Sequence, residues 1–184
     1  MYMLSAENDN IKKACAFTGH RPFRFIFRYD EKHWLCLTIK AAMADACRVL
    51  YEKHGVRFFY SGCALGVDQW GAEAVLALRE EYPDIRLICA APFPDFVSRW
   101  SEDQRKRLRR IWDASDDRGF VCREYQSEIY YKRNRFIVDR SAYLVAVYDK
   151  AASPSGGTHM TVQYAQALRR TILFIEPASG KICK

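Results

Sequence analysis

The chain has 184 residues, of which 49% are hydrophobic and 14% aromatic. This length is typical of a single domain, and the composition excludes an intrinsically disordered chain, which is poor in aromatic residues. The 29 Lys and Arg residues outnumber the 22 Asp and Glu residues, so the formal net charge is +7 at pH 7. Such a charge favours anionic partners such as phosphates, nucleotides or nucleic acid.

The sequence carries no signal for membrane insertion or secretion. It has no run of about 18 uncharged apolar residues, and residues 1–10 are polar and acidic rather than basic and then apolar. The seven cysteines include no C-x-x-C pair, so neither a zinc site nor a disulfide framework is indicated. We therefore expect a soluble cytoplasmic protein with reduced thiols, no membrane partner and no bound metal.

Short β-rich runs alternate with longer segments of helical period along the chain. Segment 31–54 shows the helical pattern clearly, because apolar residues from Leu35 and Ile39 to Val49 follow the 3.6-residue repeat and Gly55 provides a stop signal. The predicted helices are 31–54, 67–81, 97–112, 127–140 and 157–169. The predicted strands are 14–17, 56–60, 85–90, 119–122, 143–148 and 172–175.

This alternation predicts an α/β protein with a Rossmann-like, doubly wound, mostly parallel sheet that carries helices on both faces. The run 85–90 is continuously apolar, as expected for a parallel strand buried on both faces. No internal repeat or linker marks a domain boundary. We therefore expect one domain over residues 12–184, preceded by a flexible segment, residues 1–11.

Doubly wound sheets bind ligands beyond the carboxyl ends of their strands, so the loops after the predicted strands are the first candidates for a site. The first loop contains Thr18, Gly19, His20 and Arg21. Gly19 permits close approach of the backbone to a ligand, while His20 and Arg21 supply hydrogen-bond donors. A simple strand-exit turn also explains these residues.

The second loop leads directly into a helix and contains Ser61, Gly62, Ala64 and Gly66. A turn of this kind presents unpaired amide groups at the positive end of a helix dipole, where anions bind. Asp68, in the first turn of that helix, has two interpretations. It binds a ribose hydroxyl, or it stabilises the helix dipole and satisfies local amides.

The third loop contains Ser155, Gly156, Gly157 and Thr158. Two adjacent glycines with flanking hydroxyls suit a phosphate cradle, although a lone Gly-Gly pair is also typical of a flexible turn. None of the three loops matches the patterns G-x-x-x-x-G-K-[ST] or G-x-G-x-x-G. The sequence therefore disfavours an ordinary ATPase or dehydrogenase.

Two further segments are candidates for ligand contact. Arg133 and Asn134 belong to a basic cluster over residues 130–135, from which one cation can turn inward to hold a phosphate, a role that suits Arg better than Lys. A solvated helix face is the alternative for most of this cluster. The apolar run 22–27 either stacks on a base or forms a hydrophobic patch against a partner subunit.

Together these segments resemble the SLOG superfamily, which joins the DNA-processing Smf/DprA proteins and the cytokinin-activating LOG enzymes. Segment 61–68 is similar to the S-G-x-A-x-G-[IV]-D helix entry of the DNA-processing branch, and 133–138 resembles its R-N-R-I-I segment. The closest match is the YpsA-like family, whose pattern resembles T-G-H-R at 18–21, Trp100, Tyr148-Asp149 and G-G-T at 156–158. The likeness spans residues 13–177.

The resemblance implies a domain that binds a nucleotide or nucleotide-derived ligand, such as NAD, ADP-ribose or a nucleoside monophosphate, through its glycine loops. It implies a regulator or sensor without an established reaction, a link to cell division and, by analogy, a homodimer. No catalytic residue is assigned. The expected binding residues are Thr18, Gly19, His20, Arg21, Ser61, Gly62, Ala64, Gly66, Asp68, Arg133, Asn134, Ser155, Gly156, Gly157 and Thr158.

The other branches of the superfamily imply two alternative functions. LOG enzymes cleave an N-glycosidic bond with the Glu of a P-G-G-x-G-T-x-x-E motif, but Thr161 occupies that position here and cannot ionise, which argues against hydrolysis. The DNA-processing branch implies nucleic-acid binding. The basic stretch 105–110, R-K-R-L-R-R, either binds phosphates non-specifically or forms the solvated face of an amphipathic helix.

Overall fold

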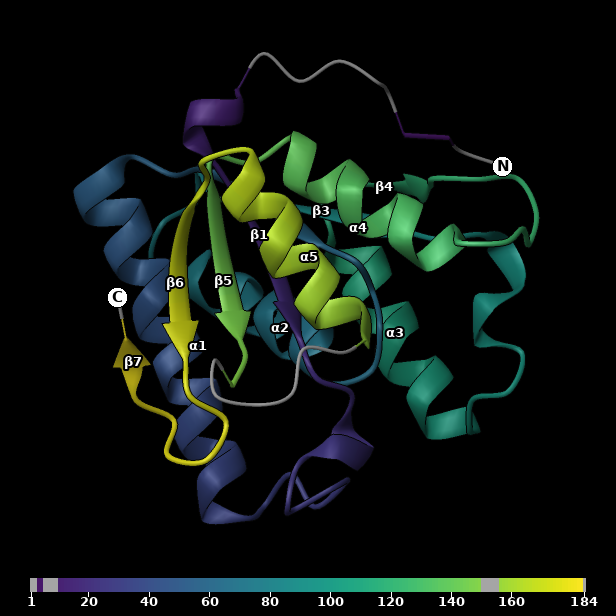
Figure 1. Ribbon diagram of the computed structural model, residues 1–184, viewed down its shortest axis with the longest axis horizontal. Helices are drawn as coiled ribbons and strands as arrows, with labels where there is room; N and C mark the ends of the chain where they lie inside the picture. The colour runs from purple at the N-terminus through teal and green to yellow at the C-terminus, as the bar shows by residue number, and fades with distance from the viewer. Residues whose placement is uncertain (1–2, 5–9, 150–155, 184) are drawn as a thin grey trace.

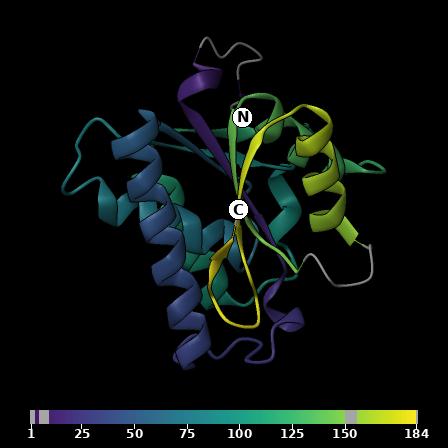
Figure 2. The same ribbon diagram turned by 60° about the vertical axis from the view of Figure 1, so that its left-hand side comes forward.

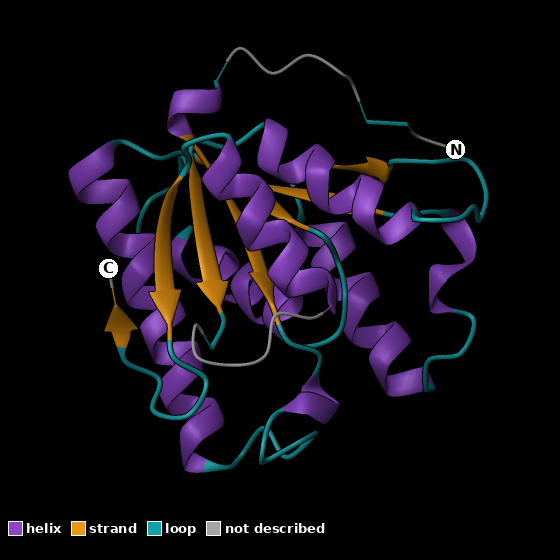
Figure 3. Ribbon diagram, viewed as in Figure 1, coloured by secondary structure: helices purple, strands orange, loops and turns teal. Residues whose placement is uncertain are grey.

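The computed structural model describes residues 3–4, 10–149 and 156–183. Strands within these ranges are β1 (Ala14–Gly19), β2 (Phe58–Ser61), β3 (Arg86–Ala91), β4 (Asp117–Phe120), β5 (Tyr143–Val147), β6 (Thr171–Ile175) and β7 (Ile182–Cys183). They form a single sheet in the order β4-β3-β2-β1-β5-β6-β7 (Figure 1). Neighbouring strands run parallel, except that β7 runs antiparallel to β6 (Figure 3).

Helices cover both faces of this sheet. They are α1 (Trp34–His54), α2 (Val67–Leu78), α3 (Glu102–Ala114), α4 (Ile129–Asp139) and α5 (Gly156–Ala167). Helices α1, α2 and α3 pack on one face and α4 and α5 on the other. Figure 2 shows α1 and α5 on opposite sides of the strands. The predicted Rossmann-like, doubly wound fold is therefore confirmed.

The central strand β1 is buried on both faces because its side chains alternate between two cores. Cys15 and Phe17 point into the core beneath α1, α2 and α3, where Phe17 stacks on Phe59 with ring centroids 6.1 Å apart. Ala14 and Ala16 face α4 and α5. The small alanine side chains leave room for those two helices to pack close to the strand.

Several element boundaries differ from the sequence prediction. Helix α3 begins at Glu102 rather than residue 97, because Ser101 and Gln104 form a capping box that fixes its start. Residues Pro94–Val97 instead form a short 3-10 helix, η3. The first helix was also predicted to begin too early, at residue 31. Helix α1 begins at Trp34, because the side chain of His33 caps it by accepting the N–H of Leu35.

Other differences arise at the edges of the sheet and on the helix surface. Strand β4 lies at Asp117–Phe120 rather than 119–122, because it follows the register of β3, in which Ile88 pairs with Asp117. Strand β7 was missed, since two residues are too few to show a periodic pattern. Val49 was assigned to the apolar stripe of the first helix, but it is 42% exposed while the adjacent Leu50 is buried.

The beginning of the described chain contacts the edge of the sheet. Met3 forms an isolated parallel bridge with Phe120, and Ile11–Lys13 form a 3-10 turn, η1, before β1. The division into a flexible segment 1–11 and one domain over 12–184 stays a prediction. None of the helices in the described part of the chain is both long enough and apolar enough to cross a membrane.

Candidate functional site

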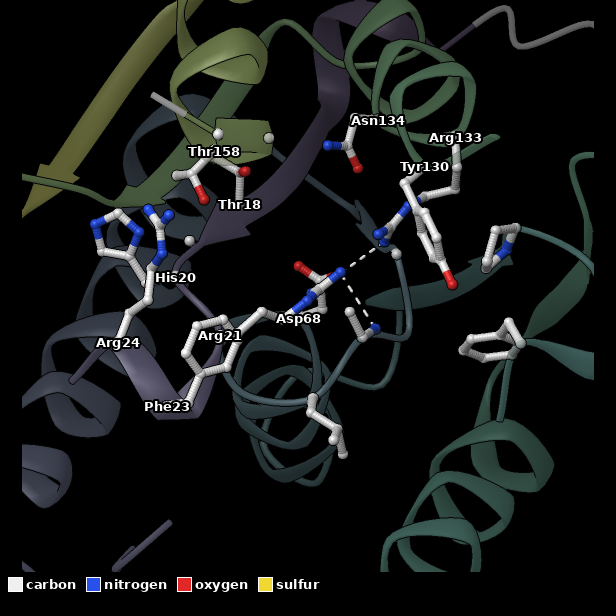
Figure 4. Close-up of a pocket in the computed structure, with 18 of the residues that line it drawn as sticks. Thr18, His20, Arg21, Phe23, Arg24, Asp68, Tyr130, Arg133, Asn134 and Thr158 are labelled. Atoms are coloured by element: carbon white, nitrogen blue, oxygen red, sulfur yellow. Dashed lines mark hydrogen bonds and ion pairs between the residues drawn. The ribbon is translucent and has the colours of Figure 1, made fainter. Parts of the chain in front are cut away.

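A cavity of about 450 Å³ lies at the carboxyl ends of β1, β2 and β5. The sheet continues from β1 through β2 in one direction and through β5 in the other. The loops after β1 and β5 therefore diverge, which is the arrangement at which doubly wound sheets bind ligands. Figure 4 shows side chains from these loops and from α4 around this space.

Most of the residues predicted from the sequence line this one cavity. They come from the loop after β1, the turn before α2, the inner side of α4 and the start of α5. The residues that line it are Thr18, Gly19, His20, Arg21, Gly62, Ala64, Asp68, Arg133, Asn134, Gly156, Gly157 and Thr158. Ser61 and Gly66 do not line it, and Ser155 lies outside the described residues.

The side chain of Ser61 holds the turn between β2 and α2. Its buried hydroxyl donates to the carbonyl oxygen of Asp68 at 2.8 Å and accepts the backbone N–H of Cys63 at 3.2 Å. Gly66 has φ +88°, a conformation that other residues rarely adopt, and a Cβ there would lie 3.0 Å from the Pro22 ring. Ser61 and Gly66 therefore shape the turn without facing the cavity.

A buried ion pair crosses the cavity floor between α4 and α2. Arg133 and Asp68 are only 2% and 5% exposed. Asp68 Oδ2 accepts Nη1 of Arg133 at 2.6 Å and the backbone N–H of Ala64 at 3.2 Å. These contacts match the second sequence interpretation of Asp68, in which it satisfies a local amide. Its partner Arg133 is the cation of the 130–135 cluster that turns inward.

Gly62 is required for this ion pair. A Cβ built at Gly62 would lie 1.2 Å from Nη1 of Arg133 and 2.7 Å from Oδ2 of Asp68. Such distances are far below van der Waals contact, so any side chain at this position would displace the guanidinium. The glycine therefore allows Arg133 to lie directly against the turn, a role that the sequence pattern alone did not show.

The loop after β1 brings two further arginines to the cavity. Arg21 directly precedes the short 3-10 helix η2, Pro22–Arg24, and Arg24 is its last residue; both line the cavity. Neither guanidinium makes a hydrogen bond or ion pair within the described part of the chain. Burial lowers the pKa of Arg21, and the charge of Arg133 adds to this effect while that of Asp68 opposes it.

His20 lines the cavity, and its surroundings disfavour the protonated imidazole. Burial lowers its pKa from the ordinary value of 6.5, and the positive charge of Arg24 lowers it further, while Asp149 acts in the opposite direction. The ring lies 6.1 Å from that of Tyr148, whose hydroxyl is 2.7 Å from Nδ1 of His159. No group of three or more metal-ligating side chains occurs in residues 3–4, 10–149 and 156–183.

The start of α5 faces the cavity with its first backbone amides. Gly156 has φ +86°, and a Cβ at Gly157 would meet only Nδ2 of Asn134, at an ordinary van der Waals distance of 3.9 Å. The first amide groups of a helix have no partners within the helix and carry partial positive charge. Arg24 lies beside them, with Nη1 3.5 Å from the Cβ position of Gly156.

Thr161, the position at which LOG enzymes carry a Glu, is buried one turn into α5. Its hydroxyl donates to the carbonyl oxygen of Gly157 at 2.7 Å and accepts Nδ2 of Asn134 at 2.8 Å. Thr161 is 1% exposed and does not line the cavity. Thr161 and Asn134 therefore fix the start of α5 against α4.

Three aromatic residues form a wall of the cavity that was not predicted from the sequence as part of the site. Phe96, Trp100 and Tyr130 line it, and the rings of Phe96 and Trp100 meet edge to face at 5.3 Å. The break at Pro92 and Pro94 was visible in the sequence, but nothing in that pattern indicated that η3 turns toward the carboxyl ends of the strands. Leu65 and Pro92 also line the cavity.

The aromatic run 22–27 divides between the cavity and the core. Phe23 lines the cavity and is 59% exposed. Phe25 and Phe27 are buried, and their ring centroids lie 5.5 Å and 6.1 Å from that of Trp70. Of the three phenylalanines, only Phe23 is therefore placed to contact a ligand.

The fold and the glycine turns around a cavity at the strand reversal define a Rossmann-like domain of the SLOG superfamily. The chain belongs to the YpsA family within it, because the YpsA model, described as the YspA SLOG family, matches residues 15–179. The UPF0398 protein YpsA of Bacillus subtilis is 31% identical over 147 residues, 77% of this chain and 80% of that protein. A UPF0398 protein of Bacillus thuringiensis is 34% identical over 147 residues, 77% of this chain and 78% of that protein.

Two solved structures share the fold at low sequence identity. DNA processing protein A of Helicobacter pylori, described for its single-stranded DNA binding mode, matches with a TM-score of 0.59 and 18% identity over 90% of this chain. DNA processing protein A of Streptococcus pneumoniae matches with a TM-score of 0.56 and 15% identity over 91% of this chain. The chain covers only 66% and 52% of those two chains.

Proposed function

We propose that this protein binds a nucleotide or nucleotide-derived ligand in the cavity beyond β1, β2 and β5, and that it acts as a regulator or sensor. The observation that supports this most is that three guanidinium groups, from Arg21, Arg24 and Arg133, line one cavity together with two glycine turns. The volume of about 450 Å³ falls within the range of roughly 300–1,000 Å³ that is usual for small-molecule sites.

The start of α5 is the proposed site of a phosphate. Gly156 and Gly157 leave the backbone accessible, and Thr158 adds a hydroxyl to the unpaired amides of the first turn. Arg24 beside this turn adds a charged donor. A phosphate here would gain both the helix dipole and a charge-assisted hydrogen bond.

The aromatic wall is the proposed site of the base. Phe96, Trp100 and Tyr130 all line the cavity, and Figure 4 shows Tyr130 on the side of Arg133, away from Thr158 at the start of α5. Aromatic rings bind a flat base by stacking and do so with little loss of conformational entropy. Under this proposal the base and the α5 phosphate occupy different parts of the cavity.

The site argues for binding rather than glycosidic hydrolysis. Asp68 is the carboxylate that lines the cavity within the described residues, and its Oδ2 already accepts bonds from Arg133 and Ala64. Thr161 at the LOG catalytic position is buried and bonded to Asn134. N-glycosidic cleavage needs a carboxylate near the sugar to stabilise positive charge or activate water.

The test is a ligand panel measured by thermal shift and calorimetry. The panel contains nucleoside mono- and diphosphates of four bases, NAD and ADP-ribose, since a ligand that binds the native state raises its apparent stability. Gly157→Leu should weaken binding by about tenfold or more, because its side chain would fill the cavity next to the α5 amides. Gln166→Leu, an exposed change on the same helix, is the matched control. Failure of every ligand to bind the wild-type protein would reject the proposal.

Nucleic-acid binding is the second candidate. It is supported by the shared fold with a protein described as binding single-stranded DNA and by the net charge of +7. Salt-dependent binding of an oligonucleotide, lost when Lys106 and Arg110 are changed to Ala, would support it. Three expectations remain predictions: the cell-division role implied by the YpsA resemblance, the homodimer drawn by analogy with SLOG relatives, and the cytoplasmic location expected from the sequence.

A further inference from the structure

The cations that line the cavity lie at two places rather than one. Arg24 is beside the start of α5, close to Gly156. Arg133 and Arg21 lie near Asp68 at the turn before α2. Figure 4 shows Arg24 next to Thr158, and Arg21 and Arg133 nearer to Tyr130. Arg24 lies where the α5 phosphate is proposed to bind. The second cluster, Arg21, Arg133 and Asp68, has no ligand group assigned to it so far.

The second cluster has more positive than negative charge. Asp68 is paired with Arg133 at 2.6 Å, while the guanidinium of Arg21 has no hydrogen bond or ion pair among the described residues. Both Asp68 and Arg133 act electrostatically on Arg21, and its pKa is lowered mainly by burial. One carboxylate therefore lies near two guanidinium groups, the buried one of Arg133 and the half-buried one of Arg21, where an uncompensated charge is costly.

Arg133 contributes a further unsatisfied donor. It is 2% exposed, and its Nε has no hydrogen-bond partner within the described part of the chain. This Nε is fully buried, so an anion in the cavity would meet the charge of Arg133 rather than this donor. Arg133 lines the same cavity as Arg21, so an anion placed between them would compensate the positive charge that Asp68 leaves unbalanced.

We propose that the ligand carries two linked anionic groups, a diphosphate, of which Arg24 and the α5 amides bind one and Arg21 with Arg133 binds the other. The proposal rests on the function proposed above and narrows the ligand class to nucleoside diphosphates and their sugar esters. Arg21 then determines the preference for a diphosphate over a monophosphate, because Asp68 is paired with Arg133 and leaves the charge of Arg21 uncompensated. A nucleoside monophosphate would occupy only one of the two anion positions.

The experiment compares the affinities of a nucleoside diphosphate and the matching monophosphate by calorimetry. The base is the one whose nucleotides bind the wild-type protein most tightly in the panel. Because charge-assisted hydrogen bonds are the strong ones, we expect the diphosphate to bind about tenfold or more tightly than the monophosphate. The ratio of the two affinities should fall toward one in Arg21→Ala and stay near the wild-type value in Arg21→Lys, which keeps the charge.

Two controls separate a lost contact from a damaged fold or a change in net charge. Arg110→Ala removes one exposed positive charge outside this cavity and should leave the ratio unchanged. Thermal unfolding of each variant without ligand shows whether it is folded. Pyrophosphate should bind more tightly than inorganic phosphate, and both should bind more weakly than the nucleotides because they lack a base.

The outcomes distinguish the inference from the function on which it rests. A diphosphate-to-monophosphate ratio near one in the wild-type protein overturns the inference and leaves nucleotide binding intact. So does a large ratio that Arg21→Ala does not reduce. If no nucleotide binds at all, the proposed function fails and the inference fails with it.

Discussion

Two groups of arginines in this protein differ in how many carboxylates accompany them. On α3, Arg107 is bonded through both of its terminal nitrogens and its Nε to Glu31 and Glu73, with distances from 2.6 to 3.0 Å. Arg105 and Arg109 on the same helix both contact Glu102. In the cavity, Asp68 is the one carboxylate among the lining residues that the structure describes, and its ion pair is with Arg133, while Arg21 and Arg24 form none there.

The comparison shows that the density of positive charge along the sequence does not locate an anion site. The stretch 105–110 has the highest local density of basic residues, yet three of its arginines are engaged by carboxylates. The cavity arginines are spread over residues 21 to 133, and their excess charge arises only when the chain folds. An anion binds where cations lack partners rather than where they are numerous. Three measurements test this contrast, from the largest expected effect to the smallest.

The largest effect is expected at the buried ion pair of the cavity. Arg133→Ala should lower the free energy of unfolding by about 3–5 kcal/mol, because it leaves the carboxylate of Asp68 buried without its partner. Denaturant unfolding at pH 7 measures this. The double variant Arg133→Met with Asp68→Asn removes both charges and should recover much of the loss. A loss below about 1 kcal/mol in Arg133→Ala would contradict a buried role for the pair.

An intermediate effect with a defined pH dependence is expected at the α3 cluster. Burial tends to raise the pKa of Glu31, but hydrogen bonds from Arg107, Lys40 and Trp70 outweigh it and lower the value to about 2. Because the pKa is depressed in the folded state, the stabilisation is present above the ordinary value of 4.5 and is lost as the pH falls toward 2.

Glu31→Gln should therefore reduce the free energy of unfolding by about 2 kcal/mol at pH 7, with the partial exposure of the cluster taken into account. The difference from the wild-type protein should shrink as the pH falls from about 5 toward 2. Denaturant unfolding at pH 7, 5 and 3 measures it, with the exposed Glu124→Gln as control. A difference that stays constant with pH would show that charge is not what Glu31 contributes.

The smallest effect is expected for the exposed pair on α3. Arg109→Ala removes a contact with Glu102 in which both side chains are more than half exposed. Water and salt screen exposed pairs of this kind, so stability should hardly change, and nucleotide affinity should be the same as in the wild-type protein. A clear loss of nucleotide binding in Arg109→Ala would place the anion site on α3 instead of in the cavity.

Local sequence signals predicted the architecture and the loops better than the boundaries and the partners. The alternation of apolar runs with helical periods predicted the doubly wound sheet, because a strand such as β3 needs both faces covered whatever lies around it. The start of α3 was predicted wrongly, although its signal, the pair Ser101 and Gln104, was present in the sequence. Strand β7 has no such signal, since it forms only by pairing with β6.

For the site, the glycine turns were predicted from the sequence, but the aromatic wall and the pairing of the arginines were not. Glycine turns at strand ends are local features, and those at Gly62, Gly156 and Gly157 line the cavity. The aromatic wall was missed because Phe96 and Trp100 reach the cavity through the path of η3, which packing determines. Arg21 and Arg24 were visible as basic residues, but whether they have carboxylate partners depends on contacts far along the chain.

By itself, the sequence determined the α/β class, the chain order of most elements and the glycine-rich turns, because these depend on periodicity and on residues close together in the chain. The tertiary structure decided which charges are paired. Asp68 meets Arg133 across 65 residues, and Glu31 meets Arg107 across 76. No local pattern encodes such pairings, since they follow from how the helices pack on the sheet. The net charge of +7 is thus a property of the sequence, while the position of its uncompensated part is a property of the fold.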